Sequence, residues 1–295
     1  MRRDDDDGPA RARPGAKPTG PRRAEGRAPG RGRDEAFRDR VHPSPEAAPN
    51  RTYRRSLQNA DGSERASTGP ASRPSAETMA PRRRRKVMPS DVTTDIRSYG
   101  SPRQAAMLEA RLADAANSYE RDRYPEALST LRDLAKTVPG VAAVRELYGL
   151  TLYRLGRWKE ALRELNAFVE LTASVDQNPV LADCERALGR HARVEQLWAD
   201  LRRAGAGSDV LAEGRLVMAG SLADRGRFHD AIALLEPAVL RAVRKPLDRH
   251  LRQWYALADL YERSGDLPRA RELFRRIVDA DPELSDALER LANLR

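Results

Sequence analysis

Residues 148–161 read YGLTLYRLGRWKEA, and residues 254–270 read WYALADLYERSGDLPRA. In both stretches a small residue, Gly149 or Ala258, lies seven positions before a glycine, and an alanine lies five positions after that glycine. The same alanine position recurs along the chain with spacings of 34, 33, 37 and 39 residues, at Ala127, Ala161, Val194, Ala231 and Ala270. A period of this length predicts an array of stacked helix pairs.

The residue types at these positions have a physical reason. A glycine can adopt a positive φ, so Gly156, Gly226 and Gly265 are expected to end the first helix of each pair. The alanines are expected where the two helices cross, because a larger side chain there would push them apart. The longer spacings place extra residues in loops between pairs, where added length costs little free energy.

Taken together, these positions resemble the tetratricopeptide repeat, a helical module that binds other proteins. The resemblance covers residues 104–295 and implies an all-α superhelix of about five helical hairpins with a capping helix. The expected repeats are 104–140, 141–174, 175–208, 209–246 and 249–282, followed by a cap at 283–295.

Residues 1–100 have a different composition. They carry 23 Lys and Arg against 14 Asp and Glu, a net charge of +9, whereas the rest of the chain carries only +1. Only six of these hundred residues are Ile, Leu, Val or Phe, too few to offset the entropy cost of ordering the backbone. This composition predicts a disordered basic tail rich in Arg, Pro and Gly.

The family resemblance implies that the first helix of each repeat lines a concave groove for a protein segment. Three tyrosines at these positions would offer flat contacts of the kind that anchor peptides. An alternative for each tyrosine is that it only packs against its neighbours. The residues carried over to the groove are Tyr119, Glu146, Tyr153, Arg154, Asp183, Arg186, Tyr255, Asp259 and Arg263.

Nothing in the sequence suggests catalysis or a cofactor. The four histidines are scattered and show no metal-ligand spacing. The single cysteine, Cys184, lies seven residues before His191, but Gly189 is expected to break the helix between them. No glycine-rich phosphate loop follows a strand. We therefore expect a protein that is not an enzyme, with no catalytic residue, metal or cofactor.

The basic tail supports a second functional hypothesis. Arg82, Arg83, Arg84, Arg85 and Lys86 form its densest positive run, and no acidic residue lies between Thr78 and Ser90. Such a run could contact RNA or the ribosome by displacing counterions, while the repeats dock a protein. The first hypothesis is that the repeats act as a scaffold or adaptor for an unidentified protein, and an alternative for the tail is that it is only a solvated linker.

Targeting signals and membrane segments are not expected. The chain begins without the apolar stretch of a secretory signal, and no run of 18 apolar residues is present. We therefore expect a cytoplasmic protein with no membrane contact. The strong preference for Arg over Lys is typical of a GC-rich bacterial genome, which favours a bacterial origin.

Overall fold

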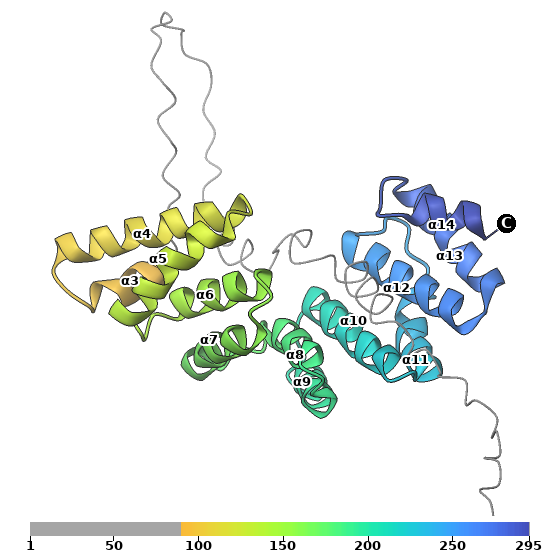
Figure 1. Ribbon diagram of the computed structural model, residues 1–295, viewed down its shortest axis with the longest axis horizontal. Coiled ribbons are helices and arrows are strands. Elements are labelled where there is room, and N and C mark those ends of the chain that lie inside the picture. The colour runs from red at the N-terminus through yellow and green to blue at the C-terminus, as the bar shows by residue number, and fades with distance from the viewer. Residues whose placement is uncertain (1–89, 295) are drawn as a thin grey trace, which may run out of the picture.

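The structure, a computed structural model, describes residues 90–294, which form twelve α-helices and no β-strand (Figure 1). This confirms the predicted all-α fold of helical hairpins. A helix α3, Ser90–Arg97, precedes five helix pairs and a last helix. The pairs are α4 (Pro102–Glu120) with α5 (Tyr124–Thr137), α6 (Ala142–Arg154) with α7 (Trp158–Thr172), α8 (Asn178–Ala187) with α9 (His191–Arg203), α10 (Ser208–Asp224) with α11 (Phe228–Val239), and α12 (Asp248–Ser264) with α13 (Leu267–Ala280); α14 (Ala287–Asn293) ends the array.

Helix α3 lies inside the range that the sequence assigned to the tail. It packs against α4, with Ile96 buried and Val92 partly buried in the same core cluster. These two apolar residues, one helical turn apart, are its only large aliphatic contacts with the array. So short an apolar pattern explains why periodicity alone did not separate α3 from the tail.

The turn inside each repeat has the geometry expected from its glycine. Gly156, Gly189, Gly226 and Gly265 all have positive φ, between 70° and 89°. In the first repeat Asp122 takes this place with a φ of 59°. Aspartate tolerates the left-handed region better than most residues that carry a side chain.

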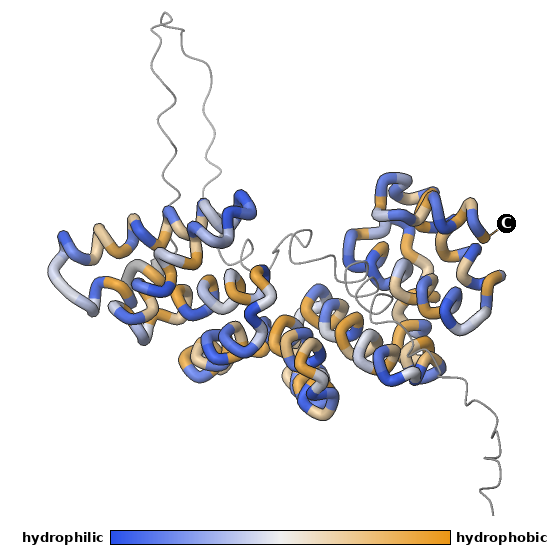
Figure 2. The backbone as a smooth tube through the Cα atoms, viewed as in Figure 1, coloured by the Kyte–Doolittle hydropathy of each residue, from blue (hydrophilic) through white to orange (hydrophobic). Residues whose placement is uncertain are grey.

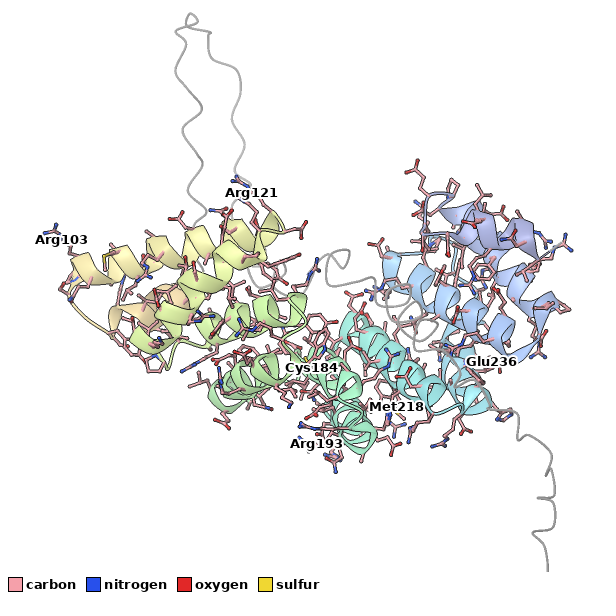
Figure 3. All side chains as sticks on the ribbon, viewed as in Figure 1. Arg103, Arg121, Cys184, Arg193, Met218 and Glu236 are labelled. Atoms are coloured by element: carbon pink, nitrogen blue, oxygen red, sulfur yellow. The ribbon has the colours of Figure 1, made fainter. Side chains whose placement is uncertain are left out.

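The second helices bury one side against their neighbours, whereas the first helices α6, α8, α10 and α12 are buried over most of their length. Figure 2 shows apolar and polar residues alternating along the tube. The core is divided into two clusters of buried residues, one extending from α3 to α10 and the other from α10 to α14. Met218 of α10 packs against both clusters. In Figure 3, Met218 and Cys184 lie in the middle of the array, where the two clusters meet.

First helices of successive repeats contact each other, whereas the second helices of successive repeats make no comparably extensive contacts in the described residues. The array therefore curves toward its first helices. Figure 1 shows this as an open arch, with α6, α8, α10 and α12 along its inside and α7, α9 and α13 outside.

The crossing of α6 and α7 leaves no room for a methyl group, so it offers a test of helix packing within a repeat. A Cβ added at Gly149 would lie 2.6 Å from Leu165 Cγ and 3.2 Å from the Leu165 backbone nitrogen. We expect Gly149→Ala to lower the free energy of unfolding by about 1–3 kcal/mol, because the two helices must separate. Chemical denaturation measures this change.

The control is Gly207→Ala. A Cβ at Gly207 meets no heavy atom within 4 Å, and the φ of this residue is −59°. We expect its effect to stay within about 0.5 kcal/mol. Equal changes in the free energy of unfolding for the two substitutions would show that the close approach of α6 and α7 at Gly149 does not limit stability.

Candidate functional site

One face of the first helices forms the candidate site. Residues at i, i+3, i+7, i+10 and i+11 share one side of a helix. We call the residues at these positions the inner face. Position i is Glu109 in the first repeat, Ala143 in the second, Asp176 in the third, Glu213 in the fourth and Arg252 in the fifth. Side-chain contacts between neighbouring repeats join several of them, which places the face along the inside of the arch.

In the middle of the array, Tyr153, Asp183 and Arg186 come together. The Tyr153 hydroxyl donates to Asp183 Oδ2 at 2.8 Å. The Arg186 guanidinium lies 3.5 Å from the other Asp183 oxygen and donates to both oxygens of Asp224, at 2.6 and 2.9 Å. Because Arg186 is only 2% exposed, this bidentate contact neutralises a buried charge and joins α8 to α10.

Gly220 makes room for this contact. A Cβ at Gly220 would lie 2.8 Å from Arg186 Cζ and 2.9 Å from its Nη1. The missing side chain therefore lets the guanidinium cross α10 on its way to Asp224.

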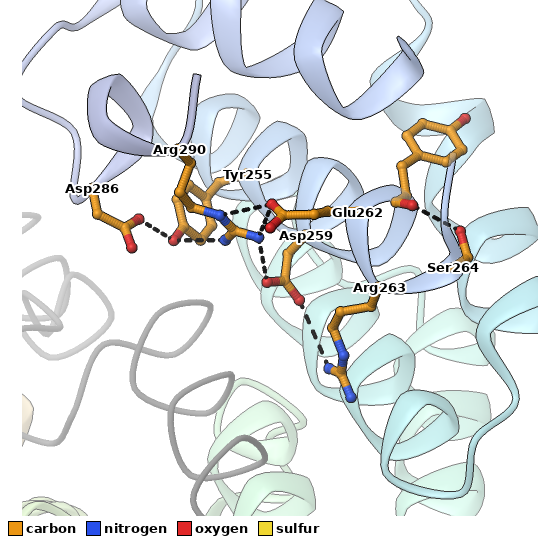
Figure 4. A network of polar contacts seen from close by, with 8 residues as sticks. Tyr255, Asp259, Glu262, Arg263, Ser264, Asp286 and Arg290 are labelled. Carbon is orange, nitrogen blue, oxygen red and sulfur yellow. Dashed lines mark hydrogen bonds and ion pairs between the residues drawn. The ribbon is translucent and has the colours of Figure 1, made fainter. Parts of the chain in front are cut away.

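A second cluster lies at the C-terminal end of the array (Figure 4). Arg290 of α14 donates to Asp259 Oδ1 at 2.8 Å, to Glu262 Oε2 at 2.6 Å and to the Tyr255 hydroxyl at 3.1 Å. The Tyr255 hydroxyl donates in turn to Asp286. Burial raises the pKa of Asp259, and the neighbouring arginines act against that shift.

Arg263 reaches the same cluster from the other side. Its Nη1 lies 3.7 Å from Asp259 Oδ2, and its guanidinium lies 4.9 Å from the centre of the Phe228 ring. Arg263 therefore connects the C-terminal cluster to the aromatic residue that starts α11.

The three N-terminal candidates do not form one cluster. Tyr119 is buried and packs edge to face on Tyr124, with ring centres 5.4 Å apart. The Arg154 guanidinium lies over the Tyr124 ring, 4.8 Å from the ring centre, and 3.5 Å from the Asp122 carboxylate. Glu146 is separate from them and accepts a hydrogen bond from Gln177 Nε2 at 2.7 Å.

Most of the predicted groove residues are thus buried at junctions between repeats. Tyr153 and Arg263 are half-buried, and the other seven are less than one tenth exposed. Their role in holding a partner stays a prediction. Arg82–Lys86, the predicted nucleic-acid contact, lie outside the described residues.

Several inner-face contacts extend beyond the candidate residues named above. Arg252 donates to Glu213, and both occupy the same position in successive repeats. Beside them Arg249 donates to Asp209 at 2.8 Å. The position of Glu213 and Arg252 in the repeat pattern was sufficient to identify both from the sequence. Arg290 lies in the capping helix, outside that pattern, so the pattern did not identify it.

The inner face is acidic. By formal count it holds nine carboxylates and four arginines, a net charge of −5, whereas residues 90–294 as a whole carry −1. Arg290 of α14 adds a positive charge beside Asp259 and Glu262, and Glu146, with a pKa of about 7, is only partly ionised at neutral pH. The carboxylates are Glu109, Glu120, Glu146, Asp176, Asp183, Glu213, Asp224, Asp259 and Glu262; the arginines are Arg154, Arg186, Arg252 and Arg263.

The described residues offer binding groups and little reactive chemistry. Burial raises the pKa of the Cys184 thiol well above its usual value, so the nucleophilic thiolate is disfavoured. Burial lowers the pKa of His191, whose Nδ1 lies 2.8 Å from the buried hydroxyl of Ser221. Between residues 90 and 294 no group of three or more His, Cys, Asp or Glu side chains could hold a metal ion. Over the same range no helix is both long enough and apolar enough to span a bilayer.

Comparison with known proteins agrees with the repeat pattern. The family model described as tetratricopeptide repeat matches residues 111–179 and 216–285. Among solved structures, the chain is similar to a thermophilic TPR protein of Thermus thermophilus, with 23% sequence identity and a TM-score of 0.49. That match covers 63% of this chain and 98% of the other. No curated protein sequence matches the chain significantly.

Glu146 is expected to make stability depend on pH. Burial raises its pKa from the usual 4.5 to about 7, and the nearby charge of Asp176 adds to the shift. The folded state therefore binds more protons than the unfolded state between these values, so stability falls as pH rises from about 4.5 to about 7. We expect a loss on the order of 1–3 kcal/mol from this group, measured by denaturation across the pH range.

The comparison that isolates this effect is Glu146→Gln, which keeps a hydrogen-bond acceptor for Gln177. We expect the variant to lack this part of the pH dependence and to be more stable than the wild type above pH 7. The exposed Glu170→Gln removes one carboxylate elsewhere and serves as the control. Parallel pH profiles for the wild type and Glu146→Gln would contradict the assignment.

A double-mutant cycle can test the role of Gly220. In an otherwise unchanged chain, Gly220→Ala should displace the Arg186 guanidinium from Asp224. In an Arg186→Met background the same substitution should stabilise the protein slightly, because alanine favours the helix by about 1 kcal/mol. We expect a coupling energy of about 1–3 kcal/mol from the four unfolding free energies. Additive effects would show that the methyl group does not disturb the pair.

Proposed function

We propose that the chain is a non-enzymatic adaptor that binds a basic protein segment on its inner face, and the match of the tetratricopeptide-repeat model to residues 111–179 and 216–285 supports an adaptor. The observation that carries this proposal is the excess of carboxylates on that face, with its net charge of −5. Opposite charges steer association and favour partners of complementary sign.

The preformed shape of the array supports the same function. Ion pairs between repeats fix the first helices relative to one another, so a partner meets a surface that is already ordered. A surface of this kind loses little entropy on binding, which favours affinity. We expect this adaptor to act in the cytoplasm.

Association with RNA or the ribosome is a second candidate function. The observation in its favour is the run Arg82–Lys86, which has no acidic residue between Thr78 and Ser90. Five cations displace only a few counterions, so this contact would be modest and strongly dependent on salt. It would add to the adaptor function of the repeats.

Affinity capture with two matched full-length variants tests the adaptor proposal. The inner variant carries Glu109→Gln, Glu120→Gln and Glu213→Gln; the outer variant carries Glu126→Gln, Glu170→Gln and Glu272→Gln. Both lose three carboxylates, and the outer three are exposed on second helices. Proteins are captured from native lysate with and without ribonuclease treatment and quantified by mass spectrometry.

We expect proteins that bind the wild type and the outer variant to be reduced at least about tenfold with the inner variant, since several interfacial charges are lost together. Equal capture by all three chains would exclude the inner face as the binding surface. Loss of the captured proteins on ribonuclease treatment would favour the RNA-associated function instead.

A further inference from the structure

Arg215 of α10 carries a positive charge that no carboxylate in residues 90–294 pairs with. It follows the inner-face residue Glu213 by two positions, so it points about 200° away from that residue around the helix axis. Arg215 is half-buried, and its Nη1 donates to the neutral Gln253 Oε1 of α12 at 2.9 Å. Burial lowers the pKa of Arg215, and the nearby charge of Arg241 adds to that shift. Two cations therefore lie close together outside the inner face.

Trp198 of α9 brings a third cation to this place. The guanidinium of Arg202 lies 5.9 Å from the centre of the Trp198 ring, and that of Arg215 lies 5.7 Å from it. The ring itself packs on α10, where a Cβ added at Gly214 would lie 3.3 Å from it. An aromatic ring attracts a cation but does not cancel its charge. The indole thus helps to hold both guanidinium groups in place and leaves both charges available to an anion.

The loop between α11 and α12 adds further positive charge. Residues 237–247 contain Arg241, Arg244 and Lys245, all exposed, and no acidic residue. The effect of Arg241 on the pKa of Arg215 places this loop beside α10. Among the described residues, none of these cations forms an ion pair with a carboxylate. We give one name, the basic edge, to Arg202, Arg215, Arg241, Arg244 and Lys245.

Neighbouring arginines show that this lack of acidic partners is local. Arg249, at the start of α12, donates to Asp209 of α10 at 2.8 Å. Arg225, at the end of α10, donates to Glu195 of α9 at 2.8 Å. The same helices therefore pair other cations across their junctions. Like charges that are held close together repel each other, so an anion bound at the basic edge would remove an unfavourable interaction.

Two exposed leucines border the basic edge. Leu240 follows the last residue of α11 and is 65% exposed, and Leu247 precedes α12 and is 49% exposed. A protein segment that carries both carboxylates and apolar side chains would match this surface. Single-stranded nucleic acid would not, because its bases stack on accessible aromatic faces and Trp198 is only 9% exposed.

We propose that the basic edge binds an acidic segment of a second protein. Carboxylates of that segment pair with Arg202, Arg215 and Arg241, and its apolar side chains contact Leu240 and Leu247. Guanidinium groups suit this role, because they bind carboxylates through two parallel hydrogen bonds. The inference goes beyond the proposed function, since it assigns a second binding surface with the opposite sign of charge. An adaptor with both surfaces brings a basic and an acidic partner together.

Zero-length carbodiimide cross-linking of the full chain tests this site. The reagent joins a carboxylate to an amine that touches it, and the probe is the amino-terminally acetylated peptide EELLEELLEE. The chain has five lysines, of which Lys245 lies in the basic edge. At low salt we expect the yield of peptide cross-links at Lys245 to exceed that at Lys136 and Lys159 at least about tenfold. Both of these control lysines are exposed, on α5 and α7.

Two variants that lose the same charge and keep Lys245 separate the basic edge from net charge. The first carries Arg202→Gln, Arg241→Gln and Arg244→Gln, and its Lys245 yield should fall at least about tenfold. The second removes three exposed arginines outside the basic edge and should keep the wild-type yield; it carries Arg103→Gln, Arg121→Gln and Arg271→Gln. Equal yields in the two variants would overturn the proposal. Cross-links confined to Lys17 and Lys86, outside the described residues, would also overturn it.

The role of Arg215 is tested through the apparent Kd, taken from the Lys245 yield as a function of peptide concentration. Arg215→Met keeps a long side chain against Trp198 but removes the charge, so it should weaken binding about fivefold or more. Gln253→Met removes the hydrogen-bond partner of Arg215 and keeps the charge, so it should change the Kd little. Equal weakening by both substitutions would overturn a direct contact between Arg215 and the segment.

The nature of the occupant is tested with other probes. The peptide EESSEESSEE should bind about fivefold more weakly, because it lacks the apolar contacts with Leu240 and Leu247. Equal affinity of the two peptides would overturn those contacts. A uridine 12-mer that displaces EELLEELLEE from Lys245 at a lower concentration than free peptide does would identify RNA as the occupant and overturn the proposal. The inner variant defined above should bind EELLEELLEE as the wild type does, so the two surfaces are tested independently.

Discussion

The close approach of the two helices within each repeat is the constraint on which the rest of the structure depends. Ala127, Ala161, Ala231 and Ala270 are completely buried at this crossing, and Gly149 leaves even less space on α6. Once the helices of a pair are packed this closely, the first helix touches its own partner and both neighbouring repeats. Only one side of each first helix is then left, and these sides together make the inner face.

Polar contacts between repeats fix how these sides follow one another. Tyr153, Asp183, Arg186 and Asp224 connect α6, α8 and α10, and Arg290 joins α12 to the capping helix. Replacing a buried ion pair with apolar residues often costs little stability, so such pairs contribute more to a defined geometry than to net stability. Here a guanidinium finds both oxygens of its acid at only one offset between neighbouring first helices, which sets the curvature of the face.

The sequence was sufficient for the fold and for part of the site. Helix pairs, turn glycines and crossing alanines follow local rules, so the period and residue types located them. Burial of Asp183 or Asp259 could not be read in this way, because their partners lie about 30 to 40 residues away and depend on how repeats stack. Helix α3 was missed because two apolar residues give too short a pattern. Arg290 was missed because the cap does not share the repeat register.

The pairing of the inner-face arginines also decides which partners the face suits. Arg186, Arg252 and Arg263 already contact carboxylates of the array, so an acidic segment would have to compete with those carboxylates for each guanidinium. A basic segment meets the opposite situation, because carboxylates exceed arginines on the face by five. At physiological ionic strength charges act over about 8 Å, so this preference operates mainly at contact distance. The preference for a basic over an acidic segment therefore depends on the number of charges that a docked segment contacts. The ion pairs between repeats add to this preference, because they occupy the inner-face arginines.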